Sequence, residues 1–131
     1  MTRINCVDVT ELVDQHLLAE YREITRVSKL ARPLSDYGVY KMGTGHVKFF
    51  YNKGAYLQKR TKQLYNECIA RGFKVELKEY PDHAEGLHQD WEPKHLDLSV
   101  NNTRLVEKIS AKPNFYKFWR QPLKENKNDK V

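Results

Sequence analysis

The residues best suited to chemistry lie at the start of the chain. Thr2 is small, so we expect removal of Met1, which makes the Thr2 α-amine the terminal group. An α-amine has a pKa of about 7.7–8.0, well below that of lysine, so part of it is uncharged at neutral pH. Such amines attack electrophilic carbon and form imines. Taken alone, however, Met-Thr is also an ordinary way for a protein to begin.

A second group of reactive side chains follows on the first predicted helix. His16, Glu20 and Glu23 fall on one line, because steps of three and four residues return to the same side of a helix. Arg22 and Arg26 flank Glu23, and neighbouring guanidinium groups favour the ionised carboxylate. Glu23 could then stabilise a developing cation or move a proton, and the arginines could bind phosphates. The same pattern also fits a solvated helix face with ordinary ion pairs.

The composition favours a nucleic-acid partner. Lys and Arg number 23 against 17 Asp and Glu, which gives a net charge of +6, and aromatic residues make up 11%. Cations neutralise phosphates and aromatic rings stack on bases. Cys6 and Cys68 match no metal or redox spacing and the chain has no Cys/His zinc pattern, so we expect two reduced, partly buried thiols. With no long apolar run and no signal peptide, we expect no membrane contact and an intracellular, cytoplasmic protein of a bacterial or phage-infected cell.

The apolar spacing predicts three helices joined by long loops. The first covers residues 9–30, with Asp8 as its cap and Leu12, Val13, Leu17, Ile24, Val27 and Leu30 inside. The second covers 53–70, with Leu57, Leu64, Tyr65, Cys68 and Ile69 inside and Gly72 as its C-terminal cap. The third covers 100–111, is capped by Ser99, and ends before Pro113.

The segments between these helices predict little regular structure. "HVKFFYN" (residues 46–52) reads as short and extended or irregular, and residues 73–95 read mostly as loop. The fold class is therefore all-α, a single compact domain of three main helices with long loops. We expect the domain to span residues 1–120, followed by a polar, flexible tail over 121–131.

Several motifs resemble the pyrimidine-dimer DNA glycosylase/AP lyase family of the phage endonuclease V type. They are "MTRIN", "ELVDQHLLAEYRE", "GTGHVKFFYNKGAYLQKR", "NECIARGF" and "KPNFYKFW", from the first residue to about Trp119. The resemblance implies an all-α enzyme without a cofactor that acts as a monomer and removes a base at UV-induced cyclobutane pyrimidine dimers in double-stranded DNA. It also implies nicking of the strand by β-elimination after an imine has formed.

The resemblance assigns roles by position. Thr2 would supply the nucleophilic amine and Glu23 the essential carboxylate. The residues that would contact DNA are Arg3, His16, Arg22, Arg26, Arg104, Lys108, Phe115 and Lys117. The linker between the first two helices is shorter than the family pattern, and residues 75–98 align poorly. Two alternatives therefore stay open: a related glycosylase for another damaged or modified base, and a non-catalytic DNA-binding protein on the same scaffold.

Overall fold

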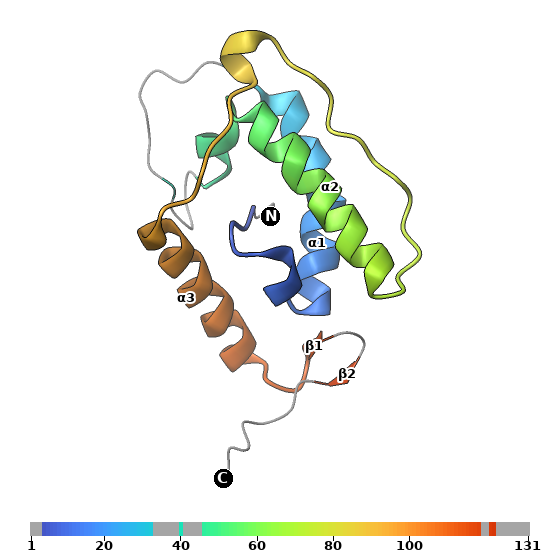
Figure 1. The fold of residues 1–131 in the computed structure, drawn as a ribbon. Helices are drawn as coiled ribbons and strands as arrows, with labels where there is room; N and C mark the ends of the chain where they lie inside the picture. Colours follow the sequence, from blue (N-terminus) through green and yellow to red (C-terminus); the bar gives the residue numbers. More distant parts are fainter. Residues whose placement is uncertain (1–3, 33–39, 41–45, 119–120, 123–131) are drawn as a thin grey trace.

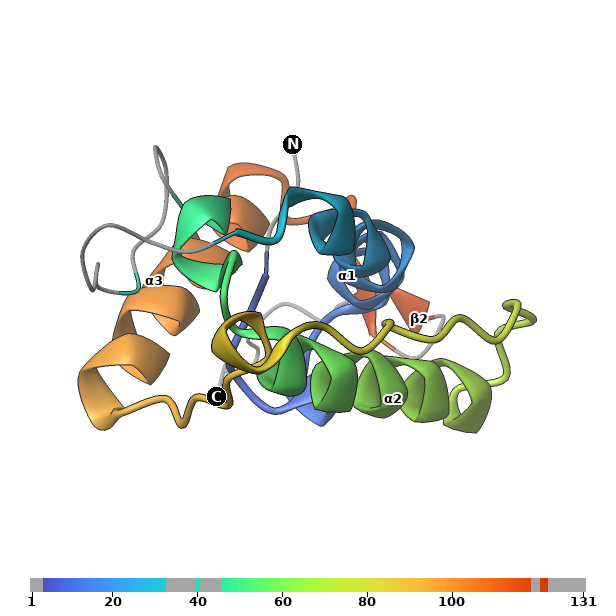
Figure 2. The ribbon, with the colours of Figure 1, turned by 90° about the horizontal axis from the view of Figure 1, so that it is seen from above.

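A computed structural model describes residues 4–32, 40, 46–118 and the backbone of 121–122. The helices α1 (Asp14–Ile24) and α2 (Gly54–Ala70) lie side by side, and α3 (His95–Ala111) faces them from the other side of the molecule (Figures 1 and 2). The extended residues 4–7 run between α3 and the α1–α2 pair (Figure 1). The prediction of an all-α domain with three main helices is confirmed.

The strands form one short hairpin. β1 (Lys117–Phe118) pairs antiparallel with β2 (Gln121–Pro122), with Lys117 opposite Pro122 and Phe118 opposite Gln121. Gln15 of α1 connects to this region, because its Nε2 donates to the Phe115 carbonyl at 2.7 Å and its Oε1 accepts from the Lys117 amide at 2.9 Å. The C-terminal segment is thereby attached to the first turn of α1.

The first predicted helix is divided into three helical segments. A 3-10 turn (Val9–Glu11) precedes α1, and a second 3-10 segment (Thr25–Leu30) follows it. Asp8 caps the first turn as predicted, since its carboxylate accepts from the Thr10 amide. Leu12 and Val13 are both buried and extended, which lets two consecutive apolar side chains reach the core. The predicted apolar residues are buried up to Val27, whereas Leu30 is exposed.

The end of α2 follows the sequence closely. Gly72 has a φ of 86°, and its amide donates to the Ile69 carbonyl while the Phe73 amide donates to the Cys68 carbonyl. This pair of bonds is the Schellman motif that a glycine cap permits. Leu57, Leu64 and Cys68 are fully buried as expected, whereas Ile69 is 46% exposed, so its assignment to the inner face was wrong.

Two predicted segments differ in the structure. Val47–Phe50 is a 3-10 turn rather than extended, because His46, Phe49 and Phe50 are all buried at helical spacing. The helix α3 starts at His95, five residues before the predicted start, so Ser99 lies inside it and does not cap it. Its start is instead fixed by the Asp97 carboxylate, which accepts from the Lys94 amide at 2.9 Å. Residues 73–84 form no regular element, as predicted.

A buried ion cluster joins the start of α1 to the end of α2. The Arg71 side chain is fully buried, with Nε 2.8 Å from a Glu67 oxygen and Nη1 3.0 Å from an Asp14 oxygen. Its Nη2 also donates to the carbonyls of Val9 and Thr10. Removing one partner of such a cluster would leave an uncompensated buried charge, which costs about 3–5 kcal/mol.

The start of α2 requires a glycine. A Cβ at Gly54 would lie 2.5 Å from His88 Nδ1 and 2.9 Å from the Leu87 carbonyl oxygen. The Gln89 carbonyl accepts from the Ala55 and Tyr56 amides, so this loop cannot move away without losing the bonds that satisfy the first amides of the helix.

We expect Gly54→Ala to lower the free energy of unfolding by about 1–3 kcal/mol, because the added methyl displaces the loop. Chemical denaturation measures this change. Gly86→Ala is the matched control, since a Cβ there meets nothing within 4 Å and the variant should stay within about 0.5 kcal/mol of the parent. Equal stability of the two variants would contradict the assigned close contact.

Candidate active site and DNA interface

The segment of residues 4–7, called the extended segment below, is buried and belongs to no helix or strand. Ile4, Asn5, Cys6 and Val7 have exposed fractions of 0, 3, 7 and 5%. Buried backbone groups must be hydrogen-bonded, and this segment belongs to no sheet. Side chains from the rest of the molecule supply the partners instead.

Aromatic and imidazole side chains bind the first part of this segment. The Ile4 amide donates to His46 Nε2 at 2.7 Å, and the Ile4 carbonyl accepts from the Tyr40 hydroxyl at 3.1 Å. The Tyr56 hydroxyl donates to the Asn5 carbonyl at 3.2 Å. Burial raises the pKa of both tyrosines well above the ordinary value, so each hydroxyl keeps its proton as a donor.

An ion pair and an amide bind the second part. Arg60 Nη1 donates to the Val7 carbonyl at 2.7 Å, and its Nε lies 2.9 Å from Glu20 Oε2. Burial opposes the charge of Arg60, but attraction to Glu20 and their hydrogen bond raise its pKa above the ordinary value. Asn101 Oδ1 accepts from the Cys6 amide at 2.6 Å and from the Val7 amide at 3.1 Å. The segment is thus fixed by side chains of α2 and α3, and by Glu20 of α1 through its ion pair with Arg60.

The predicted catalytic carboxylate lies near the end of α1. The Glu23 side chain is 21% exposed, with Oε1 2.9 Å from Arg26 Nη1 and Oε2 3.9 Å from Arg22 Nε. Both arginines are mostly exposed, at 66% and 62% of their side chains, and can reach a bound anion. Glu20, on the adjacent turn, points inward to Arg60 rather than sharing a surface with Glu23.

The structure brings a second group of predicted residues together around α3. A groove of about 330 Å³ is lined by Arg104, Glu107, Lys108, Ala111, Lys112 and Tyr116, and Glu107 Oε1 lies 3.9 Å from Arg104 Nη1. His16 joins it from α1, with its ring 4.8 Å from that of Tyr116. Phe115 is 55% exposed and packs edge-on against Tyr116, and Lys117 is exposed beside it. We call this set the basic groove.

Two polar atoms in the basic groove have no hydrogen-bond partner among the described residues. They are His16 Nδ1 and Arg104 Nε, and both are inaccessible to solvent in the folded chain. Burial, and then the charge of Lys108, lower the pKa of His16 from its ordinary 6.5. Buried polar atoms of this kind are rare and usually have a functional explanation.

The predicted site residues therefore form two groups along α1. Glu23 is seven residues from His16, which is about 10 Å along a helix. Arg22, Glu23 and Arg26 form the first group, and His16 with the α3 and C-terminal residues forms the second. The predicted site residues Thr2 and Arg3 lie outside the described residues.

Sequence reasoning missed the polar residues that fix the extended segment. Arg60 could have been found, because it lies three residues after Leu57 and four before Leu64, on the buried face of α2. His46 stands at helical spacing before Phe49 and Phe50. Asn101 gave no such signal, because the sequence does not show which of the adjacent Asn101 and Asn102 is buried.

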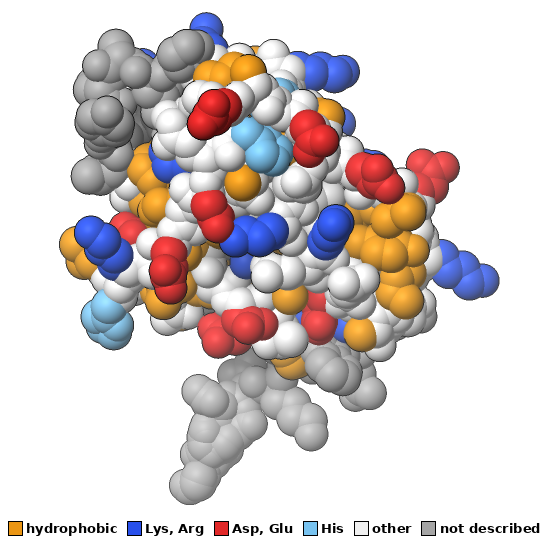
Figure 3. Space-filling view, turned by 45° about the horizontal axis from the view of Figure 1, so that its top comes forward, with side chains coloured by type: hydrophobic (Ala, Val, Ile, Leu, Met, Phe, Trp, Pro, Cys, Tyr) orange, Lys and Arg blue, Asp and Glu red, His pale blue; other side chains and the backbone are white. Residues whose placement is uncertain are grey.

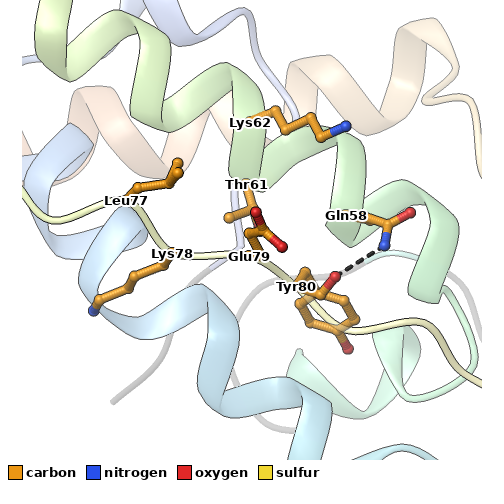
Figure 4. Close-up of a pocket in the computed structure, with 7 residues that line it drawn as sticks. All are labelled: Gln58, Thr61, Lys62, Leu77, Lys78, Glu79 and Tyr80. Carbon is orange, nitrogen blue, oxygen red and sulfur yellow. Dashed lines mark hydrogen bonds between the residues drawn. The ribbon is translucent and has the colours of Figure 1, made fainter.

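Two further pockets lined by described residues do not include Glu23. A pocket of about 240 Å³ lies between α2 and residues 77–80, where Gln58 Nε2 donates to the Tyr80 carbonyl at 2.9 Å (Figure 4). Charges of both signs are interspersed on the face drawn in Figure 3, so that face has no single basic patch. Among the described residues, no group of His, Cys, Asp or Glu is arranged to hold a metal ion, and both cysteines are free and buried. No helix of the described part is long and apolar enough to cross a membrane.

Comparison with known families gives one match. A family model described as pyrimidine dimer DNA glycosylase matches residues 1–80, which is more than half of the chain. The matched stretch includes the extended segment, α1 with Glu23, and α2. It ends before α3 and the basic groove residues of the C-terminal part.

We expect Lys108→Met to raise the pKa of His16 toward 6.5, because the substitution removes the positive charge that disfavours the imidazolium. Titration of the ring signals by NMR measures the change. The unfolded chain has the higher His16 pKa, so it takes up protons first and stability falls as pH drops below 6.5. The variant should lose less stability over this window.

Lys112→Met is the control for that titration, since Lys112 is one turn farther along α3 and does not contribute to the shift. Its His16 pKa should match that of the parent. An equal rise in both variants would show that the effect is not specific to Lys108.

Proposed function

This chain belongs to the pyrimidine dimer DNA glycosylase family, so it is a DNA repair glycosylase that acts on DNA, and we propose that it also nicks the strand as an AP lyase. In this proposal the nucleophile is the Thr2 α-amine and the substrate is a cyclobutane pyrimidine dimer in double-stranded DNA. The observation that carries it is the fixed, buried segment Ile4–Val7, which ends beside the helix that bears Glu23.

The length of the chain limits where the amine can act. Two residues of extended backbone span about 7 Å, so the Thr2 nitrogen must lie within that distance of the Ile4 nitrogen. The Ile4 amide is itself fixed on His46, and Asn5 is fixed on Glu20 by a 2.9 Å bond. Fixing Ile4 and Asn5 limits the volume within which the amine could meet a deoxyribose, and such proximity favours attack.

Glu23 is suited to the charge that develops in the reaction. Glycosidic bond cleavage creates positive charge on the deoxyribose, and a nearby carboxylate stabilises it. Arg22 and Arg26 keep the Glu23 side chain in place and can bind the flanking phosphates. The same carboxylate can move protons during imine formation and elimination.

The proposed reaction steps need no reagent other than water. The neutral amine attacks C1′, and the base departs with the electron pair of the glycosidic bond and takes up a proton. Loss of the amine proton and opening of the sugar ring give an imine. Removal of a C2′ proton then breaks the C3′–O bond, and the 3′ phosphate leaves. Water finally hydrolyses the imine and releases the Thr2 amine.

The basic groove supports the DNA contact. Arg104 and Lys108 line a cavity together with Tyr116, and the His16 ring packs against Tyr116. We propose that this groove binds phosphates of the damaged duplex, together with Arg3 and Lys117. The enzyme would act as a monomer.

The decisive experiment incubates the protein with a duplex that contains one pyrimidine dimer or one abasic site and adds borohydride. We expect a covalent protein–DNA adduct on the Thr2 peptide, identified by mass spectrometry. Acetylation of the terminus, or one extra residue before Thr2, should abolish the adduct because the nucleophile is blocked or displaced. Unchanged trapping by the acetylated protein would refute the role of the amine.

Duplexes with other damaged bases test the choice of substrate. Preference for the dimer over them supports the proposed lesion, whereas cleavage of another base instead points to the related glycosylase. Binding without any nicking points to a non-catalytic DNA-binding protein.

We expect Glu23→Gln to lower the nicking rate by about 100-fold or more, because the amide keeps the shape but neither carries charge nor accepts a proton. Single-turnover kinetics on the abasic duplex measure the rate, and DNA binding should persist. Glu11→Gln is the matched control, since Glu11 is an exposed carboxylate before α1 and should keep the parent rate. Retained cleavage in the Glu23 variant would remove this residue from the mechanism.

A further inference from the structure

Asn101 is the only buried side chain of α3, a helix whose residues are all described. Its exposed fraction is 0%, whereas Asn102 next to it is exposed. The other side chains of α3 are half-buried or exposed. The Asn101 side chain is therefore the part of α3 that is packed most closely against the rest of the molecule.

All the hydrogen bonds of the Asn101 side chain go to the extended segment. Its Oδ1 accepts from the amides of Cys6 and Val7, at 2.6 and 3.1 Å. Its Nδ2 donates to Asn5 Oδ1 at 2.8 Å, and Asn5 in turn donates to Glu20 at 2.9 Å. One side chain thus fixes three consecutive residues, Asn5, Cys6 and Val7, which follow Thr2 by three to five positions.

The position of Asn101 also sets the orientation of the basic groove. Arg104 and Lys108 follow it by three and seven residues, so the three residues share one face of α3. Rotation of α3 about its axis would break the Asn101 bonds and turn both basic side chains away together.

We propose that Asn101 is a positioning residue, which fixes the reach of the Thr2 amine relative to DNA held on α3. This inference rests on the proposed function. Without the Asn101 bonds, the long 3.6 Å hydrogen bond from Cys6 Sγ to the Asp97 carbonyl still joins the extended segment to α3, so the place of the segment relative to that helix is less well defined. The amine then spends less time at C1′, which lowers the rate at saturating DNA more than it lowers binding.

Two variants separate the acceptor from the volume of the side chain. Asn101→Leu has a similar size but no acceptor for the Cys6 and Val7 amides, whereas Asn101→Asp keeps the acceptor. We measure the rate of borohydride trapping on a saturating abasic duplex, at a temperature where circular dichroism shows each protein fully folded. Affinity is measured on a duplex with an uncleavable abasic analogue.

We expect Asn101→Leu to trap at least tenfold more slowly than the parent, with affinity changed less than threefold. Asn101→Asp should stay within threefold of the parent in both measurements. Asn102→Leu is the matched control and should be unchanged, because its side chain is exposed on the same helix.

A folded Asn101→Leu that traps within threefold of the parent overturns the inference, as does an Asn101→Asp that loses as much rate as the leucine variant. If only the leucine variant fails to fold, the aspartate variant is compared with the parent. Trapping within threefold of the parent supports the inference, and slower trapping overturns it. Failure of both to fold shows a role in folding and also overturns it. Failure of the proposed function is distinct, because then the parent protein itself forms no adduct.

Discussion

The structure depends on hydrogen-bonding a buried extended segment that has no neighbouring strand. Six backbone groups of Ile4–Val7 bond to side chains, from Tyr40, His46, Tyr56, Arg60 and Asn101. An unpaired buried backbone group costs about 1–3 kcal/mol, so each of these side chains is required as a partner. This requirement explains why a small core contains so many polar residues.

The same requirement explains an ion pair between the packed helices. Glu20 and Arg60 have almost no exposed side-chain surface, and an apolar pair of similar volume would often be at least as stable. Arg60, however, also donates to the Val7 carbonyl, and Glu20 accepts from Asn5. The pair therefore specifies the place of the extended segment, which apolar side chains cannot do. Glu23 is three residues beyond Glu20, so one helix both fixes the segment and presents the proposed catalytic carboxylate.

The sequence predicted the features that depend on local spacing. The Asp8 cap, the Gly72 cap and the apolar stripes of the first two helices, except for Leu30 and Ile69, were confirmed, because each arises within a few residues. The early start of α3 was missed, since it depends on the Asp97 cap rather than on apolar period. The polar core was missed because its bonds join residues up to 96 positions apart. Such pairs leave no periodic pattern, and only the fold shows that Asn5 and Asn101 meet.

The basic groove has an energetic consequence for DNA binding. In the free protein, His16 Nδ1 and Arg104 Nε are buried without partners among the described residues, and each such atom costs free energy. A phosphate in the groove would be attracted by the charges of Arg104 and Lys108, which line it. The phosphate would also offset the charge of Lys108 and raise the pKa of His16, which burial and Lys108 lower in the free protein. Binding would then be coupled to proton uptake, and affinity would rise as pH falls through the titration range of His16.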